Sequence, residues 1–117
     1  MGKKNEIKDR SFDFALRIIE LTDALPERNT GYVLGKQIMR SGTSIGANVE
    51  EALAGSSKKD FKYKMSIALR EARETNYWLR LIKESEIMEP ARLKSLIEES
   101  VELKKILTKI VKNTNTK

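Results

Sequence analysis

Residues 41–55 read SGTSIGANVEEALAG, a pattern typical of the second half of a helix that is rich in small and polar residues. At about 100° per residue, one face of this helix combines apolar and polar side chains. That face holds Leu34, Ser41, Ile45, Asn48, Val49 and Ala52. A neighbouring row holds Gly35, Met39, Gly42 and Gly46. Because a glycine inside a helix costs roughly 1 kcal/mol relative to alanine, several in one row indicate that another backbone or a bulky side chain approaches closely there.

The polar residues of this stretch have two compatible interpretations. They belong to a tightly packed core helix, or they form a hydrogen-bonded contact that fixes helix register or a subunit interface. We assign Ser41, Asn48 and Glu51 to a structural polar core.

Length and composition indicate one domain that spans residues 1–117, with loose tails at about 1–8 and 113–117. No apolar run approaches the roughly 20 residues that a membrane-spanning helix needs, and the N-terminus leads into charge instead of an apolar signal core. We therefore expect a cytoplasmic protein with no membrane partner. The chain has no Cys and no His, which excludes disulfides, imidazole catalysis and most transition-metal sites. We expect no metal and no cofactor.

Upstream of this stretch, a first helix is predicted from about Asp9 to Leu25, where Pro26 ends it. It carries two apolar stripes, Phe12, Ala15, Leu16 and Ile19 beside Phe14, Ile18, Leu21 and Leu25. Such a wide apolar face predicts contact with two neighbouring helices. The second helix is predicted from about Gly31 to Ala54, with Asn29 or Thr30 as N-cap and Gly55 as C-cap.

Downstream, a third helix is predicted from about Lys58 to Ser85, with Ser57 as N-cap. Its heptad seam holds Phe61, Met65, Ala68, Ala72, Thr75, Leu79 and Ile82. A fourth helix is predicted from about Pro90 to Lys112, with Glu89 as N-cap. Its stripe holds Leu93, Leu96, Leu103, Leu107 and Ile110. Because the connections are short, we predict an all-α, antiparallel up-down-up-down four-helix bundle.

Most of the formal net charge of +6 lies in residues 58–83, which hold eight Lys or Arg against three Asp or Glu. On the third helix, the face opposite the seam holds Lys59, Lys62, Ser66, Arg70, Arg73, Tyr77 and Arg80. Cations at every third or fourth residue are suited to phosphate groups, and Tyr77 could stack on a base. The alternative is a solvated helix face with pairs such as Arg70 and Glu74. Lys36 and Arg40 could extend the surface.

A third strip of the same helix is too apolar for simple solvent surface, and it holds Tyr63, Ile67, Glu71, Glu74, Trp78 and Leu81. We interpret this strip as an oligomer interface. The alternative is that Trp78 packs inside its own bundle. Glu51, Glu71 and Glu74 do not predict a metal site, because carboxylate di-metal sites in bundles use Glu-x-x-His pairs. Salt links to Arg40, Arg70 or Arg73 are expected instead.

Three motifs resemble one protein family. They are Gln37-Ile38-Met39-Arg40-Ser41, Ser44-Ile45-Gly46-Ala47-Asn48-Val49-Glu50-Glu51 and Ser57-Lys58-Lys59-Asp60-Phe61. They resemble the four-helix-bundle proteins encoded in intervening sequences of bacterial 23S ribosomal RNA genes, and the accessory proteins of diversity-generating retroelements look like relatives. The resemblance implies a four-helix protomer, a homopentamer and nucleic-acid binding. Where the family has Ala-Glu-Gly, this chain has Glu50-Glu51-Ala52, so the matching glutamate is Glu51.

Together these features predict a non-enzymatic, oligomeric protein that binds nucleic acid, RNA above all, with little sequence specificity. No activated serine, phosphate-cradling glycine loop or paired acid and base indicates an enzyme. The predicted phosphate contacts are Lys59, Lys62, Arg70, Arg73, Arg80, Lys36 and Arg40. The alternative function is a protein-binding adaptor or scaffold ring that recruits a partner enzyme.

Overall fold

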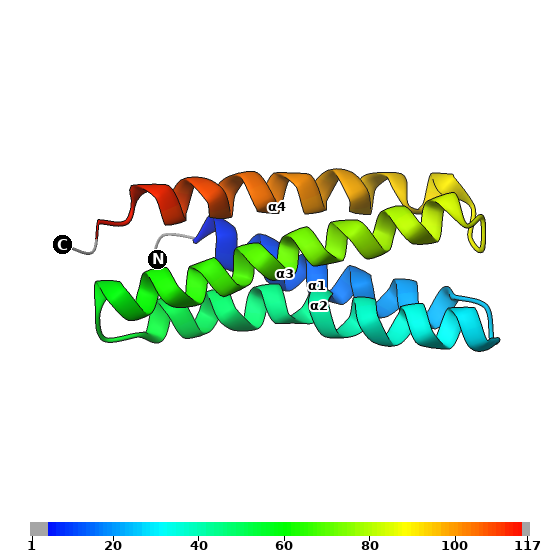
Figure 1. The fold of residues 1–117 in the computed structure, drawn as a ribbon, viewed down its shortest axis with the longest axis horizontal. Coiled ribbons are helices and arrows are strands. Elements are labelled where there is room, and N and C mark those ends of the chain that lie inside the picture. Colours follow the sequence, from blue (N-terminus) through cyan, green and yellow to red (C-terminus); the bar gives the residue numbers. More distant parts are fainter. Residues whose placement is uncertain (1–4, 116–117) are drawn as a thin grey trace.

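This computed structural model describes residues 5–115. They contain four α-helices and one short 3-10 turn (Figure 1). In chain order they are α1 (Glu6–Ala24), α2 (Asn29–Ala54), α3 (Lys58–Glu84), η1 (Pro90–Arg92) and α4 (Lys94–Asn113). This part of the chain contains no strand. The loose tails expected at 1–8 and 113–117 fall partly on residues 1–4 and 116–117, outside the described range, whereas residues 6–8 and Asn113 are helical.

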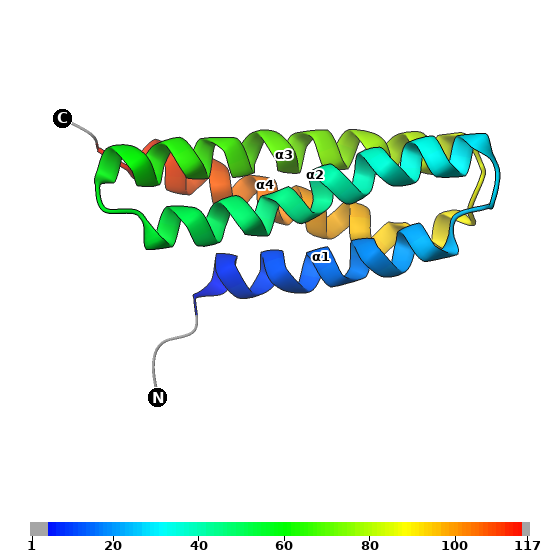
Figure 2. The same ribbon diagram turned by 90° about the horizontal axis from the view of Figure 1, so that it is seen from below.

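Consecutive helices pack side by side and run in alternating directions, which confirms the predicted up-down-up-down bundle (Figures 1 and 2). α2 and α4 each contact both α1 and α3. α1 and α3 are therefore diagonal to one another, and Figure 2 shows them along opposite edges of the molecule. The contact between α1 and α4 is the sparsest of the four.

Two helix starts differ from prediction. α1 begins at Glu6 instead of Asp9, because the side chain of Asn5 accepts a hydrogen bond from the backbone N–H of Lys8 at 3.1 Å and caps the helix there. α2 begins at Asn29 with Arg28 as its N-cap, so neither Asn29 nor Thr30 is the cap. The chain turns sharply after Pro26, whose carbonyl accepts from the backbone N–H of Arg28 at 2.9 Å.

The start of α4 also differs from prediction. Pro90 opens the 3-10 turn η1, and α4 begins only at Lys94, with Leu93 as its cap. The backbone N–H of Leu93 donates to the carbonyl of Pro90 at 3.0 Å, the i→i−3 bond of a 3-10 turn. This tighter turn places the Leu93 side chain in the core, fully buried. The other predicted caps are confirmed: Ser57 Oγ accepts from the N–H of Asp60 at 3.0 Å, and Gly55 ends α2.

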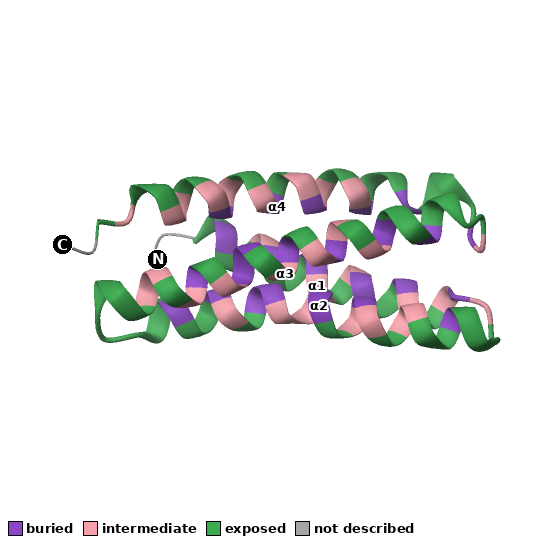
Figure 3. Cartoon of the chain, viewed as in Figure 1, coloured by how far each residue is buried: buried purple, intermediate pink, exposed green. Residues whose placement is uncertain are grey.

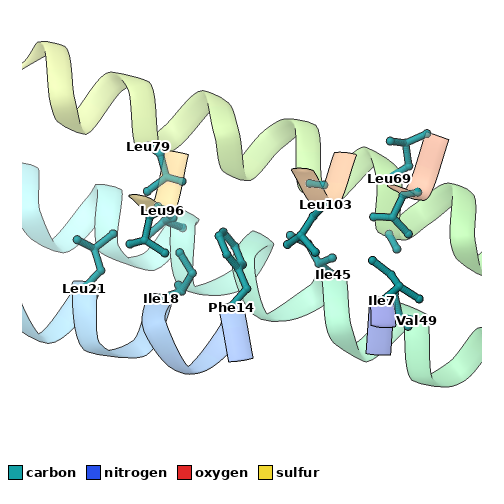
Figure 4. Packing of buried hydrophobic residues seen from close by; sticks show 14 of the residues in the cluster. Ile7, Phe14, Ile18, Leu21, Ile45, Val49, Leu69, Leu79, Leu96 and Leu103 are labelled. Atoms are coloured by element: carbon teal, nitrogen blue, oxygen red, sulfur yellow. The ribbon is translucent and has the colours of Figure 1, made fainter. Parts of the chain in front are cut away.

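The core is a single apolar layer along the bundle axis, to which each helix contributes one stripe (Figures 3 and 4). The stripes are Phe14, Ile18 and Leu21 from α1, Ile38, Ile45 and Val49 from α2, Met65, Leu79 and Ile82 from α3, and Leu96, Leu103 and Leu107 from α4. Burial of such side chains contributes about 1.5–3 kcal/mol each.

One of the two predicted stripes of α1, the stripe with Phe12, Leu16 and Ile19, is not part of this core. Phe12, Leu16 and Ile19 are 55%, 48% and 40% exposed, whereas Phe14 and Ile18 are buried. The predicted contact of α1 with two neighbouring helices is confirmed, since α1 packs against α2 and α4, but only one of its two apolar stripes turns inward.

The predicted close approach at the glycine row of α2 is confirmed. A Cβ added at Gly42 would lie 2.8 Å from Cγ1 of Ile18, and one at Gly46 would lie 3.3 Å from the carbonyl oxygen of Ser11. Both contacts are to α1. The missing side chains of α2 let α1 pack against its backbone.

The predicted polar core is confirmed only at Ser41. The hydroxyls of Ser41 and Thr75 are buried and share a hydrogen bond of 2.9 Å that joins α2 to α3. Asn48 is half-buried and donates within its own helix, to the carbonyl of Ser44 at 2.9 Å. Glu51 is exposed, so its assignment to a buried polar core was wrong. On the α2 surface, Glu51 lies where water solvates its charge, at no desolvation cost.

Candidate nucleic-acid interface

The contacts of α3 with its two neighbours define its sides. Toward α2, Glu71 and Glu74 meet Arg40. Toward α4, Nδ2 of Asn76 donates to Oγ of Ser100 at 2.9 Å. The residues of α3 that lie between these two sides, opposite the buried heptad seam, face away from the bundle.

Three cations lie on the α4 side of this outward surface. Arg80 Nε donates to Oδ1 of Asn76 at 2.9 Å, which places Arg80 beside the Asn76–Ser100 contact. Arg73 precedes Arg80 by seven residues, or two helical turns, and Lys62 precedes Arg73 by eleven, or about three turns. Helical geometry therefore aligns the three along one side of α3.

The outer edge of α3 alternates cations with apolar and aromatic side chains. Tyr63, Arg70 and Tyr77 follow one another at seven-residue steps, with Lys59 one turn before them and Leu81 one turn after. All five residues are exposed. We call Lys59, Lys62, Arg70, Arg73 and Arg80 the basic face; it extends about 31 Å along the helix at 1.5 Å per residue.

None of these five cations forms an ion pair within residues 5–115. The ion pairs in that range link Arg10 to Glu6 and Glu99, Arg40 to Glu71 and Glu74, and Lys105 to Glu102. The expected pair of Arg70 with Glu74 is absent there, because Glu74 accepts instead from Arg40 and from Nε1 of Trp78. The positive charge of the basic face is therefore not neutralised by neighbouring carboxylates.

Aromatic rings adjoin the basic face. The ring of Tyr77 meets that of Trp78 edge-on, with 5.2 Å between centroids and 69° between planes. The guanidinium carbon of Arg80 lies 5.8 Å from the Tyr77 ring centroid. The Tyr77 side chain stays 47% exposed, so a face of its ring can reach a flat ligand.

Arg40 and Lys36, the two cations predicted to extend this surface, lie on α2. The guanidinium of Arg40 donates to Glu71 at 3.3 Å and to Glu74, so two carboxylates balance its charge. Lys36 lines a shallow surface groove between α1 and α2, together with Asp23, Tyr32 and Arg40 itself. The assignment of Lys36 and Arg40 to the nucleic-acid surface stays a prediction.

The predicted interface strip divides into two groups. Ile67, Glu71, Glu74 and Trp78 are half-buried, and Trp78 packs against the core of its own bundle, as the alternative interpretation had it. Tyr63 and Leu81 are exposed and remain available for contacts between molecules. The pairing of Arg40 with Glu71 and Glu74 matches the expected salt links and joins α2 to α3.

One polar contact was not predicted from the sequence. Nε and Nη2 of Arg10 donate to the two carboxylate oxygens of Glu99 at 2.9 and 2.6 Å, which joins α1 to α4. The hydrogen bond to Glu99 raises the pKa of Arg10 above its usual value. Arg17 likewise donates to Ser95. Arg10 and Glu99 lie 89 residues apart in sequence, so no local pattern could reveal this pair.

In residues 5–115, no group of three or more acidic side chains could hold a metal ion. The surface grooves described for the same range are shallow and open, and the one between α1 and α2 mixes polar and apolar lining. None of the helices there is both long enough and apolar enough to cross a membrane.

Comparison with known proteins gives two findings. The profile of the 23S rRNA-intervening sequence protein family matches residues 3–109. The chain is also similar to a crystal structure from Bacteroides thetaiotaomicron, described as a protein with unknown function from the S23 ribosomal protein family. That similarity has a TM-score of 0.86 and 44% sequence identity, and it covers 92% of this chain and 99% of the other. A search of curated proteins found no match.

Proposed function

Since the chain belongs to the 23S rRNA-intervening sequence protein family, we propose that it is a non-enzymatic, self-associating protein that binds nucleic acid, RNA above all, through α3. The observation that carries this proposal is the basic face, whose five cations have no carboxylate partner in residues 5–115.

The charges of the basic face suit a phosphate backbone more than they suit bases. Cations on a helix neutralise phosphates and release condensed counterions, which drives binding without sequence preference. Arg80 is the best-positioned of the five cations, because its guanidinium donates to Asn76. Asn76 is held in turn by the hydrogen bond that it donates to Ser100 of α4. Tyr77 adds a ring on which an unpaired base can stack. No side chain of the basic face is arranged to read a base edge in a groove, so low sequence specificity follows.

The test measures binding of a fluorescently labelled 20-nucleotide RNA, and of DNA of the same sequence, by anisotropy at low salt. The double variant Arg73→Glu/Arg80→Glu should weaken binding at least tenfold, because it replaces two phosphate contacts with two repulsions. The matched control is Arg28→Glu/Arg92→Glu, which changes the net charge equally at two exposed positions outside α3 and should reduce the affinity much less.

Two results would reject the proposal. Equal loss in both variants would mean that only net charge matters, not the basic face. If neither RNA nor DNA bound at low salt, the proposed phosphate contact would be rejected and the adaptor function favoured. In the adaptor function a partner protein binds, and its binding persists in the Arg73→Glu/Arg80→Glu variant.

A further inference from the structure

α4 carries a row of cations on the side that it turns toward α3. Lys94, Lys105 and Lys112 are exposed and follow one another at steps of eleven and seven residues, or about three and two helical turns. We call these three residues the α4 row. Lys94 lines a shallow groove together with Lys83 of α3, so the row adjoins α3.

The α4 side of α3 holds a matching row. Lys62, Arg73 and Arg80 stand at the same steps of eleven and seven residues, and we call them the α3 row. α3 and α4 lie side by side and run in opposite directions (Figure 1). The hydrogen bond between Asn76 and Ser100 places these two residues at the same height along the bundle. Heights on both helices are therefore counted from this contact.

The cations of the two rows form three pairs. Arg80 lies four residues from the Asn76–Ser100 contact and Lys94 lies six residues from it toward the same end of the bundle, so their heights differ by about 3 Å. The other two pairs match as closely. The pairs are Arg80 with Lys94, Arg73 with Lys105, and Lys62 with Lys112. They follow one another about 13.5 Å apart, so the two rows run together for about 27 Å.

Few carboxylates oppose the two rows. Among the six cations, only Lys105 forms an ion pair within residues 5–115, with Glu102 at 3.5 Å. Both side chains of that pair are largely exposed, and surface pairs of this kind contribute little, so a phosphate can replace the carboxylate. Glu98 lies in the groove beside Lys94 but forms no ion pair in the same range. The surface of α3 and α4 is therefore positively charged on both helices.

The surface between the two rows holds no aromatic ring in the described part of the chain. Helical position places Leu69, Asn76, Ile97 and Val101 there. The ring of Tyr77 lies beyond the α3 row, on the outer edge of α3. Proteins that hold single strands stack the bases on aromatic rings along a charged groove. This surface offers cations without such rings, so it suits phosphate groups more than unpaired bases.

We propose that α3 and α4 together bind a double-stranded nucleic acid across its narrow groove, with the α3 row on one phosphate backbone and the α4 row on the other. This inference rests on the proposed function and names a duplex as its ligand. A duplex brings its two backbones close together across one groove, the minor groove in B-DNA and the major groove in A-form RNA. A single strand has one backbone, which one row is enough to bind.

The test compares three ligands that carry the same labelled sequence, by fluorescence anisotropy at low salt. They are a single-stranded RNA, the RNA duplex that contains it, and the DNA duplex of the same sequence. We expect at least one duplex to bind about tenfold more tightly than the single strand, because six cations meet phosphates instead of three. The duplex that binds more tightly identifies the source of the backbone pair.

A variant of the α4 row separates the contributions of the two helices. Lys94→Ala/Lys105→Ala should weaken duplex binding about tenfold more than a matched control does, and single-strand binding no more than the control does, because the α3 row is intact. The control is Arg28→Ala/Arg92→Ala, which removes the same charge from two exposed positions outside both rows.

Three results would overturn the proposal and leave the proposed function standing. Tighter binding of the single strand than of either duplex would exclude the duplex as the preferred ligand. Equal losses of duplex and single-strand affinity in Lys94→Ala/Lys105→Ala would show that both rows serve one strand. A loss no larger than that of the control would show that α4 makes no contact. If none of the three ligands bound, the proposed function would be rejected as well.

Acetylation of lysines, read by mass spectrometry with and without the duplex, maps the contact on the unaltered protein. The duplex should protect Lys94 and Lys112 from the reagent. Lys8 should react equally in both samples, because it is exposed on α1, which lies diagonally across the bundle from α3 (Figure 2). Equal protection of all three lysines would contradict a contact through α3 and α4.

Discussion

Replacing Gly42 with alanine tests how closely α1 and α2 pack. The new Cβ would lie 2.8 Å from Cγ1, 3.0 Å from Cγ2 and 3.3 Å from Cβ of Ile18. Ordinary carbon contacts lie at about 3.5–4.0 Å, so α1 and α2 must separate by several tenths of an ångström or more. The Ile18 side chain cannot rotate away easily, because it is β-branched and fully buried.

Two effects of opposite sign determine how much Gly42→Ala changes the free energy of unfolding. Alanine gains about 1 kcal/mol over glycine in a helix interior. Overpacking a tight core costs about 1–3 kcal/mol, and the upper part of that range applies where the clash involves a β-branched side chain. We therefore expect Gly42→Ala to lower the free energy of unfolding by about 1–2 kcal/mol.

Gly35→Ala is the matched control on the same helix. Its Cβ would meet only Cδ1 of Leu25, at 3.4 Å, so the propensity gain should dominate and stability should rise by about 0.5–1 kcal/mol. Thermal and urea unfolding followed by circular dichroism measure both variants. If Gly42→Ala were as stable as Gly35→Ala, the close packing of α1 on α2 would be refuted.

Two further variants test the polar contacts between helices. Ser41→Ala and Thr75→Val, alone and together, should show a coupling energy of about 1 kcal/mol in urea unfolding, because the single change at Thr75 leaves a buried hydroxyl without its partner; additive losses would show that the two hydroxyls do not interact. Arg10→Met should lower the free energy of unfolding by about 1 kcal/mol and speed amide hydrogen exchange in α1 above that in α2, since the bidentate bond to Glu99 joins the two helices with the sparsest contact. Uniform exchange across the bundle would contradict that role.

The helical pattern was predictable because local periodicity sets it. The heptad seam of α3 and the glycine row of α2 both appear in the structure as expected, since each depends only on residues of one helix. The N-cap of α3 was predictable for the same reason: Ser57 and Asp60 lie within one turn.

Features that depend on a contact between two helices could not be predicted from the sequence of either helix alone. The periodicity of α1 did not show which of its two apolar stripes faces inward, because that depends on the approach of α1 to Gly42 and Gly46. The role of Arg40 likewise depends on α3, which places Glu71 and Glu74 beside it. A cation that looks free in the sequence can be neutralised by a carboxylate far along the chain.

The central claim is that cations on α3 contact phosphate directly, and the salt dependence of binding tests it most directly. For a single strand, the logarithm of the association constant falls with the logarithm of salt concentration by about 0.7 per phosphate contact. Removing two contacts with Arg73→Ala/Arg80→Ala should therefore flatten the slope by about 1.4. A slope equal to that of the unaltered protein would show that these arginines do not contact the nucleic acid.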